Sequence, residues 1–119
     1  MVTKIAKTIK EWVPEVADFV LDRHKLNEHI SDYILLQELA TICACKINSG
    51  SEKDLERVQE IAKIVNVLYH GENQYVRNAI ENEFLTNLSS GVCTESIKKY
   101  IGLFPIQLKE GYIKTILNS

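Results

Sequence analysis

Apolar residues recur at intervals of three and four along most of the chain, which is the spacing of one buried face on an α-helix. The pattern is clear over residues 2–12, 31–48, 51–70, 75–88 and 105–117. Shorter segments at 14–26 and 94–101 are consistent with further helices. No run alternates apolar and polar residues for long enough to predict a half-buried strand. The pattern therefore predicts an all-α protein of about six to seven amphipathic helices.

Polar residues and proline mark where these helices begin. Ser31 and Ser51 can accept hydrogen bonds from the free N–H groups at the start of a helix. Ser51 followed by Asp54 also resembles a capping box. Pro14 disfavours helical geometry at Val13 but suits the first position of a new helix, so it predicts a break or a kink there.

Glycines mark where several helices end, and short connections restrict the architecture. Gly50, Gly71 and Gly91 each follow a periodic segment, whereas Gly111 lies inside the last one at a cost of about 1 kcal/mol relative to alanine. Connections of three to six residues favour antiparallel neighbours. We expect one domain over residues 1–119, either a compact bundle or a short HEAT-like stack of helical pairs.

Composition is that of an ordinary globular protein, with 45% hydrophobic and 25% charged residues among 119. The apolar runs are far shorter than the roughly 20 residues of a membrane span, so the sequence predicts neither a signal peptide nor a membrane span. The three cysteines, Cys43, Cys45 and Cys93, favour a reducing compartment, so we expect a cytoplasmic protein without a membrane partner. The net charge of −2 argues against nucleic-acid binding by counterion release.

Few residues are placed as a catalytic or metal site requires. His24 and His29 lie near several acids, but a spacing of five does not put both on one helical face. Cys43 and His70 could form a nucleophile pair, yet Cys43 lies on an apolar stripe, as buried cysteines commonly do. We expect no catalytic residue, no metal and no cofactor, and therefore a protein that is not an enzyme.

Acidic residues are concentrated in two parts of the chain. Glu11, Glu15, Asp18 and Asp22 are spaced four, three and four apart and would form one negative ridge on a continuous helix. Such a ridge would attract a basic partner. The alternative is that these acids favour a helix N-terminus or solvate an outer face.

A second acidic group lies in the fifth predicted helix and just before it. Glu72, Glu81 and Glu83 are relieved only by Arg77 in this part of the chain, and Tyr75 lies among them. Tyrosine is enriched at protein interfaces, although it also caps cores with its hydroxyl in water. We predict both acidic groups, with Tyr75, as contacts for a protein partner.

One stretch of the chain resembles a known class of proteins. The sequence Val76-Arg77-Asn78-Ala79-Ile80-Glu81-Asn82-Glu83-Phe84-Leu85, followed by Leu88 and by Leu103-Phe104-Pro105, resembles small bacterial helical proteins, among them immunity proteins of contact-dependent growth inhibition and other polymorphic toxin systems. The resemblance implies a protein that binds and neutralises a cognate toxin domain, often a basic nuclease. The oligomeric state stays open.

Two other functions remain possible from the sequence. The chain could be a helical-repeat scaffold that binds a peptide or a second copy without any toxin. A metal-dependent enzyme that uses His24 and His29 is the least favoured of the three hypotheses.

Overall fold

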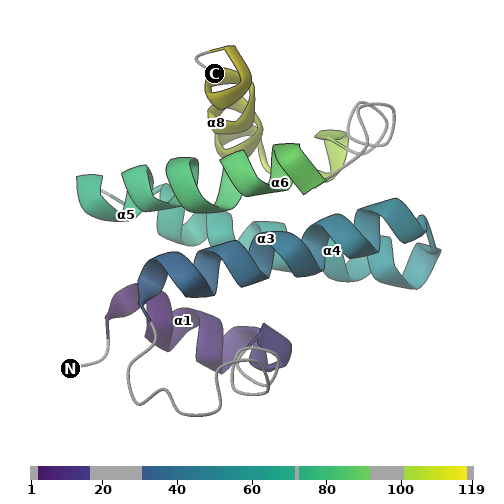
Figure 1. Ribbon diagram of the computed structural model, residues 1–119, viewed down its shortest axis with the longest axis horizontal. Coiled ribbons are helices and arrows are strands. Elements are labelled where there is room, and N and C mark those ends of the chain that lie inside the picture. The colour runs from purple at the N-terminus through teal and green to yellow at the C-terminus, as the bar shows by residue number, and fades with distance from the viewer. Residues whose placement is uncertain (1–2, 17–30, 72, 92–100, 118–119) are drawn as a thin grey trace.

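The computed structural model describes residues 3–16, 31–71, 73–91 and 101–117, and within these ranges the chain is helical with no β-strand. The α-helices are α1 (Lys4–Trp12), α3 (Asp32–Ser49), α4 (Glu52–Tyr69), α5 (Gln74–Ala79), α6 (Thr86–Gly91) and α8 (Ile106–Leu117), shown in Figure 1. A π-helical segment, η1 (Ile80–Leu85), joins α5 to α6, and a short 3-10 turn, η2 (Ile101–Leu103), precedes α8. The all-α prediction is confirmed. The helix expected at 94–101 and most of that at 14–26 fall outside the described residues.

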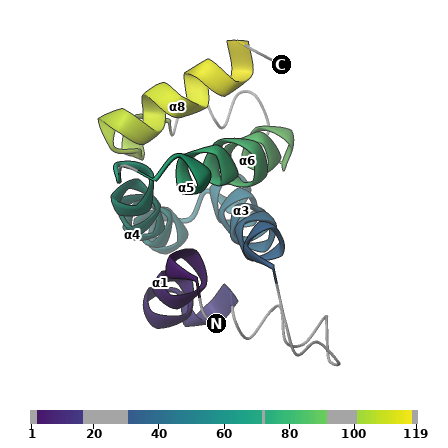
Figure 2. The same ribbon diagram turned by 90° about the vertical axis from the view of Figure 1, so that its left-hand side faces the viewer.

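The helices form a bundle of layers around one apolar core. Figure 2 shows α1 on one side of the pair α3 and α4, the helix α5–η1–α6 on the other side, and α8 beyond it. Each layer contributes fully buried side chains, such as Ile9 of α1, Leu39 of α3, Ile61 of α4 and Leu108 of α8. No described helix is both long and apolar enough to span a membrane.

Hydrogen bonds confirm the predicted helix starts. The hydroxyl of Ser31 accepts from the N–H of Ile34 at 3.2 Å, and the hydroxyl of Ser51 accepts from the N–H of Asp54, also at 3.2 Å. The second half of the capping box is relayed rather than direct. Ser49 donates its hydroxyl to Asp54 at 2.7 Å and accepts from the N–H of Ser51 at 3.3 Å.

The predicted ends and breaks also have a clear backbone basis. Gly50 follows α3 with a φ of 69°, a left-handed conformation that glycine adopts without steric cost. Val13 leaves helical geometry at φ −132° and ψ 68°, and residues 14–16 are helical again. Pro14 therefore marks a break in the helix, as the residue before a proline avoids the helical region.

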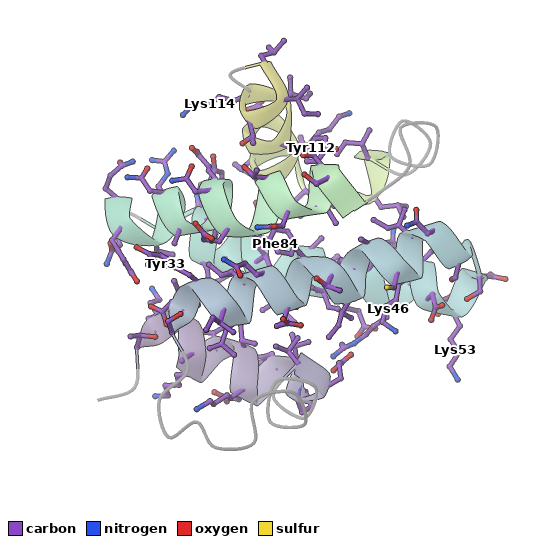
Figure 3. All side chains as sticks on the ribbon, in the orientation of Figure 1. Tyr33, Lys46, Lys53, Phe84, Tyr112 and Lys114 are labelled. Carbon is purple, nitrogen blue, oxygen red and sulfur yellow. The ribbon has the colours of Figure 1, made fainter. Side chains whose placement is uncertain are left out.

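Periodicity leaves open whether Phe84 or Leu85 of the π-helical segment faces the core. In the structure both are buried, and Figure 3 shows Phe84 between this helix and the α3–α4 layer. Two backbone carbonyls of this segment also accept hydrogen bonds from side chains. Thr86 donates its hydroxyl to the carbonyl of Glu81 at 3.0 Å, and Asn87 donates to that of Glu83 at 2.6 Å.

The last helix buries only part of its apolar surface. Leu108, Gly111 and Tyr112 face inward, whereas Ile106, Ile113, Ile116 and Leu117 are exposed. Gly111 lies against Tyr69 of α4, where an added Cβ would be 2.6 Å from the tyrosine Oη. The glycine inside this helix therefore allows α8 to approach Tyr69 closely.

Candidate protein-interaction surface

The first acidic group does not form a continuous ridge in the described structure. Glu11 is exposed on α1, and Glu15 is half-buried beyond the break at Val13. A ridge with the predicted spacing requires an unbroken helix through these positions, which the conformation of Val13 excludes. Asp18 and Asp22 lie outside the described residues, so their role stays a prediction.

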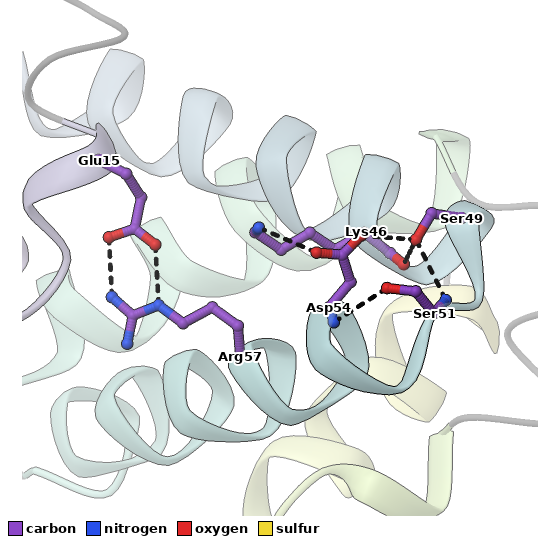
Figure 4. Close-up of polar contacts among 6 residues, drawn as sticks. All are labelled: Glu15, Lys46, Ser49, Ser51, Asp54 and Arg57. Carbon is purple, nitrogen blue, oxygen red and sulfur yellow. Dashed lines mark hydrogen bonds and ion pairs between the residues drawn. The ribbon is translucent and has the colours of Figure 1, made fainter.

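Glu15 is held by an arginine of α4. Its carboxylate accepts two hydrogen bonds from Arg57, Nε to Oε2 and Nη2 to Oε1, both at 2.8 Å (Figure 4). Arg57 Nη2 also donates to the backbone carbonyl of Trp12 at 3.2 Å. This bidentate ion pair lowers the pKa of Glu15 below its usual value. The contact fastens the C-terminal end of α1 to α4.

The Glu15–Arg57 pair should make stability depend on pH. Because the pKa of Glu15 is lowered in the folded state, its contribution is fully present above the ordinary glutamate value of 4.5 and is lost as the pH falls through the lowered value. Both side chains are partly exposed, so Glu15→Gln should cost at most about 1 kcal/mol near neutral pH. Urea unfolding at neutral and acidic pH measures the difference from the unmodified chain. Glu11→Gln, at an exposed position, is the control. If Glu15→Gln lowered the free energy of unfolding by the same amount at neutral and at acidic pH, the ion pair would not be the cause.

The second acidic group is also engaged within the molecule. Glu81 accepts a hydrogen bond from Tyr69 Oη at 2.6 Å and lies 3.6 Å from Lys114 Nζ. Glu83 accepts from Gln37 Nε2 at 2.6 Å. Burial together with the nearby Glu81 raises the pKa of Tyr69 to about 12, so its hydroxyl stays a donor. Glu72 lies outside the described residues.

Tyr75 is half-exposed but its hydroxyl has a defined partner. It donates to Asp32 Oδ2 at 3.0 Å, while Thr3 donates to the other oxygen of the same carboxylate at 2.5 Å. Burial of the hydroxyl and the hydrogen bond to Asp32 raise the pKa of Tyr75 to about 12. Its ring packs at a tilt against Tyr33, with centroids 6.3 Å apart. Tyr75 thus joins the start of α1, α3 and α5.

The described members of the two acidic groups do not meet on one face. Glu11 belongs to α1, whereas Glu81 and Glu83 belong to η1, and the α3–α4 layer separates these elements (Figure 2). A partner that covers one described group would not reach the other across the bundle. Among the predicted contacts in the described ranges, Glu11 is the exposed carboxylate.

A different surface beside Glu11 is open to solvent and apolar. Trp12 of α1 and Ile64 and Val67 of α4 line a groove of about 320 Å³, with Thr8 and Lys63 completing its wall. Trp12 is 59% exposed and Val67 is 69% exposed. Large apolar side chains gathered at an exposed groove are typical of a protein contact. We call these five residues the α1–α4 groove.

One charged side chain forms part of the wall of the α1–α4 groove, and another is adjacent to Trp12 in the sequence. Glu11 directly precedes Trp12 on α1, and the exposed Lys63 belongs to the wall. An apolar centre with a charged rim is the usual composition of a protein–protein interface. The bidentate pair of Glu15 and Arg57, with its bond to the Trp12 carbonyl, holds one end of the groove in place.

Sequence periodicity assigns Trp12 together with Val13 to the inward face of the first helix. In the structure Trp12, the last residue of α1, points outward, whereas Val13, which has left helical geometry, is fully buried. The signal for an outward position was that Trp12 directly follows two charged residues, Lys10 and Glu11.

Other possible chemistry lies within the core or outside the described residues. Cys43 is buried, and burial raises the pKa of its thiol to about 12, so it stays protonated as a packing residue. His70, at the end of α4, is exposed. His24 and His29 fall outside the described ranges. Within those ranges no group of three or more histidine, cysteine or acidic side chains is placed to hold a metal ion.

Comparison with known proteins gives one family match. A model described as a domain of unknown function (DUF7674) matches residues 6–118, which is nearly the whole chain. No curated protein and no solved structure matches the chain.

Proposed function

The chain belongs to the DUF7674 family, and from its surface chemistry we propose that it is a protein-binding module that contacts its partner through the α1–α4 groove. The observation that supports this proposal is the outward position of Trp12 next to Val67. Tryptophan is the residue type most enriched in binding hot spots, and burying an exposed tryptophan with its neighbours favours association through the hydrophobic effect.

The specific form that we propose is an immunity protein that neutralises a toxin domain. The partner would place an apolar side chain in the groove and a basic side chain near Glu11. Three other predicted acidic contacts, Glu15, Glu81 and Glu83, already have partners within the chain, so they would join an interface only by exchanging these contacts. A mainly apolar groove predicts binding that depends less on salt than an acidic ridge would.

Trp12→Ala should weaken binding of the partner by about tenfold or more, because the substitution removes the largest exposed apolar side chain of the groove. The proposal expects a toxin gene immediately upstream in the source genome, and the product of that gene is the partner to test by titration calorimetry. Ile106→Asp, on the distant helix α8, is the control and should bind as the unmodified chain does. Equal affinities for the Trp12→Ala variant and the unmodified chain would contradict the proposed groove.

Protection of cells from the toxin separates the immunity protein from a scaffold. Co-expression of the chain should restore growth to cells that produce the upstream toxin domain, and Trp12→Ala should reduce that rescue. Binding of a non-toxic helical partner, with no rescue, would favour the alternative of a helical scaffold without a toxin partner. A strong loss of binding on raising the salt concentration would instead favour the acidic contacts over the groove.

A further inference from the structure

The outer face of α8 carries a second exposed apolar surface, far from the α1–α4 groove. Ile106 is 71% exposed, Ile113 is 44% exposed and Leu117 is 78% exposed. Together with Glu110 they follow one another at spacings of four, three and four residues, which is the seam pattern of two packed helices. The opposite side of the same helix is buried through Leu108 and Tyr112. The helix thus has one apolar side in the core and another in solvent.

This outer face has a shallow hollow that is largely open to solvent. Glu110, Ile113, Lys114 and Leu117 surround about 290 Å³ of space. They stand at positions i, i+3, i+4 and i+7, and four residues in this arrangement form the hole that receives a knob from a facing helix. A second helix therefore fits this surface.

We propose that the occupant is α8 of a second copy of the chain, packed antiparallel about a twofold axis near the middle of the helix. In such an interface the same surface serves both copies, so it must complement itself. The centre of α8 meets this condition. When two α8 helices are antiparallel about an axis level with residue 112, Glu110 lies opposite Lys114 of the partner subunit, and the two copies of Ile113 lie close to the axis.

The two charged residues at this centre, Glu110 and Lys114, have opposite signs. Lys114 Nζ lies 3.6 Å from Glu81 Oε1, and the Lys114 side chain is 63% exposed. The lysine could therefore contact Glu110 of the partner subunit while it keeps its own carboxylate neighbour. A parallel arrangement would instead place each residue beside its own copy, with like charges facing each other.

The expected dimer is weak. Twelve residues of helix are about 18 Å long, which is too short for α8 alone to bury the roughly 1,200–2,000 Å² of a stable standard interface. Association should therefore rise with concentration. Because α1 lies on the other side of the bundle (Figure 2), the dimer would leave the α1–α4 groove open, and this inference does not depend on the proposed function.

Sedimentation velocity over a concentration series of the whole chain tests the proposal. The mass should rise from the 13.6 kDa of one chain towards twice that value. Ile113→Asp should weaken association by about tenfold or more, since a symmetric interface contains each substitution twice. Val67→Asp places the same charge at an exposed aliphatic position of the α1–α4 groove and should leave association unchanged. A monomer at every concentration, or an equal effect of both variants, would overturn the proposal.

Charge exchange tests the antiparallel arrangement separately. Glu110→Lys should weaken association, because the substitution places a positive charge near Lys114 of the partner subunit. Adding Lys114→Glu to the same chain should restore part of the lost association, because opposite charges face each other again. Circular dichroism of each variant verifies that the fold is retained. A double variant that associates no better than Glu110→Lys alone would exclude the antiparallel pairing.

Discussion

Phe84→Ala should lower the free energy of unfolding by about 3–5 kcal/mol. Phe84 is 1% exposed and belongs to η1, which packs against α3 and α8, so truncation removes apolar contacts from the core and leaves a cavity. Domains of this size are typically stable by only about 5–15 kcal/mol. Urea unfolding followed by circular dichroism should therefore show a much lower midpoint.

An exposed aromatic residue provides the comparison for Phe84. Tyr33 is half-exposed and contacts Tyr75 through a tilted ring pair, so Tyr33→Ala should cost about 0.5–1.5 kcal/mol. If Phe84→Ala lowered the free energy of unfolding by no more than Tyr33→Ala, Phe84 would not be tightly packed in the core.

Gly111→Ala should destabilise the protein by about 2 kcal/mol, although alanine is the better helix former. The new Cβ would lie 2.6 Å from Oη and 2.9 Å from Cζ of Tyr69. The buried ring is held by the hydrogen bond to Glu81 and by Arg77, whose guanidinium lies 5.5 Å from the ring centre. Either α8 moves away from α4 or Tyr69 loses its hydrogen bond to Glu81, and both changes lower the free energy of unfolding.

Two further substitutions show whether Tyr69 causes that loss. Gly102→Ala places a methyl group where no other atom lies within 4 Å, so thermal unfolding should show almost no change. Combining Gly111→Ala with Tyr69→Phe removes the nearest atom, the hydroxyl oxygen. The double variant should lose less stability than the sum of the two single changes. A fully additive loss would place the cause elsewhere.

Local signals were sufficient to predict most of the described helices. Ser31, Ser51 and Gly50 act within one turn of their own position, because capping is a matter of nearby backbone groups. Pro14 restricts Val13 in the same local way. The periodic apolar positions of 51–70 also predicted the core face of α4, since a helix with one apolar side must bury that side. Those of 31–48 predicted only part of the core face of α3, where Leu36 and Ala40 are buried as well.

Contacts between distant residues could not be predicted from the sequence. Arg57 is 42 residues from Glu15, and Gln37 is 46 residues from Glu83. Spacing along one helix reveals which acids share a face of that helix, but not which donor another helix brings to them. For the same reason the exposure of Trp12 depends on where α4 packs, which periodicity within residues 2–12 does not determine.

The π-helical segment has a consequence for the comparison of this chain with its relatives. The buried residues Val76, Ile80, Phe84 and Leu88 recur every four residues, a longer interval than the 3.6 of an α-helix. Residues 74–91 therefore contain about one residue more than an unbroken α-helix whose first and last buried positions face the core in the same way. A family member with an unbroken helix should lack one residue between Glu81 and Phe84. An ungapped alignment with such a relative would match core positions to surface positions from there onward.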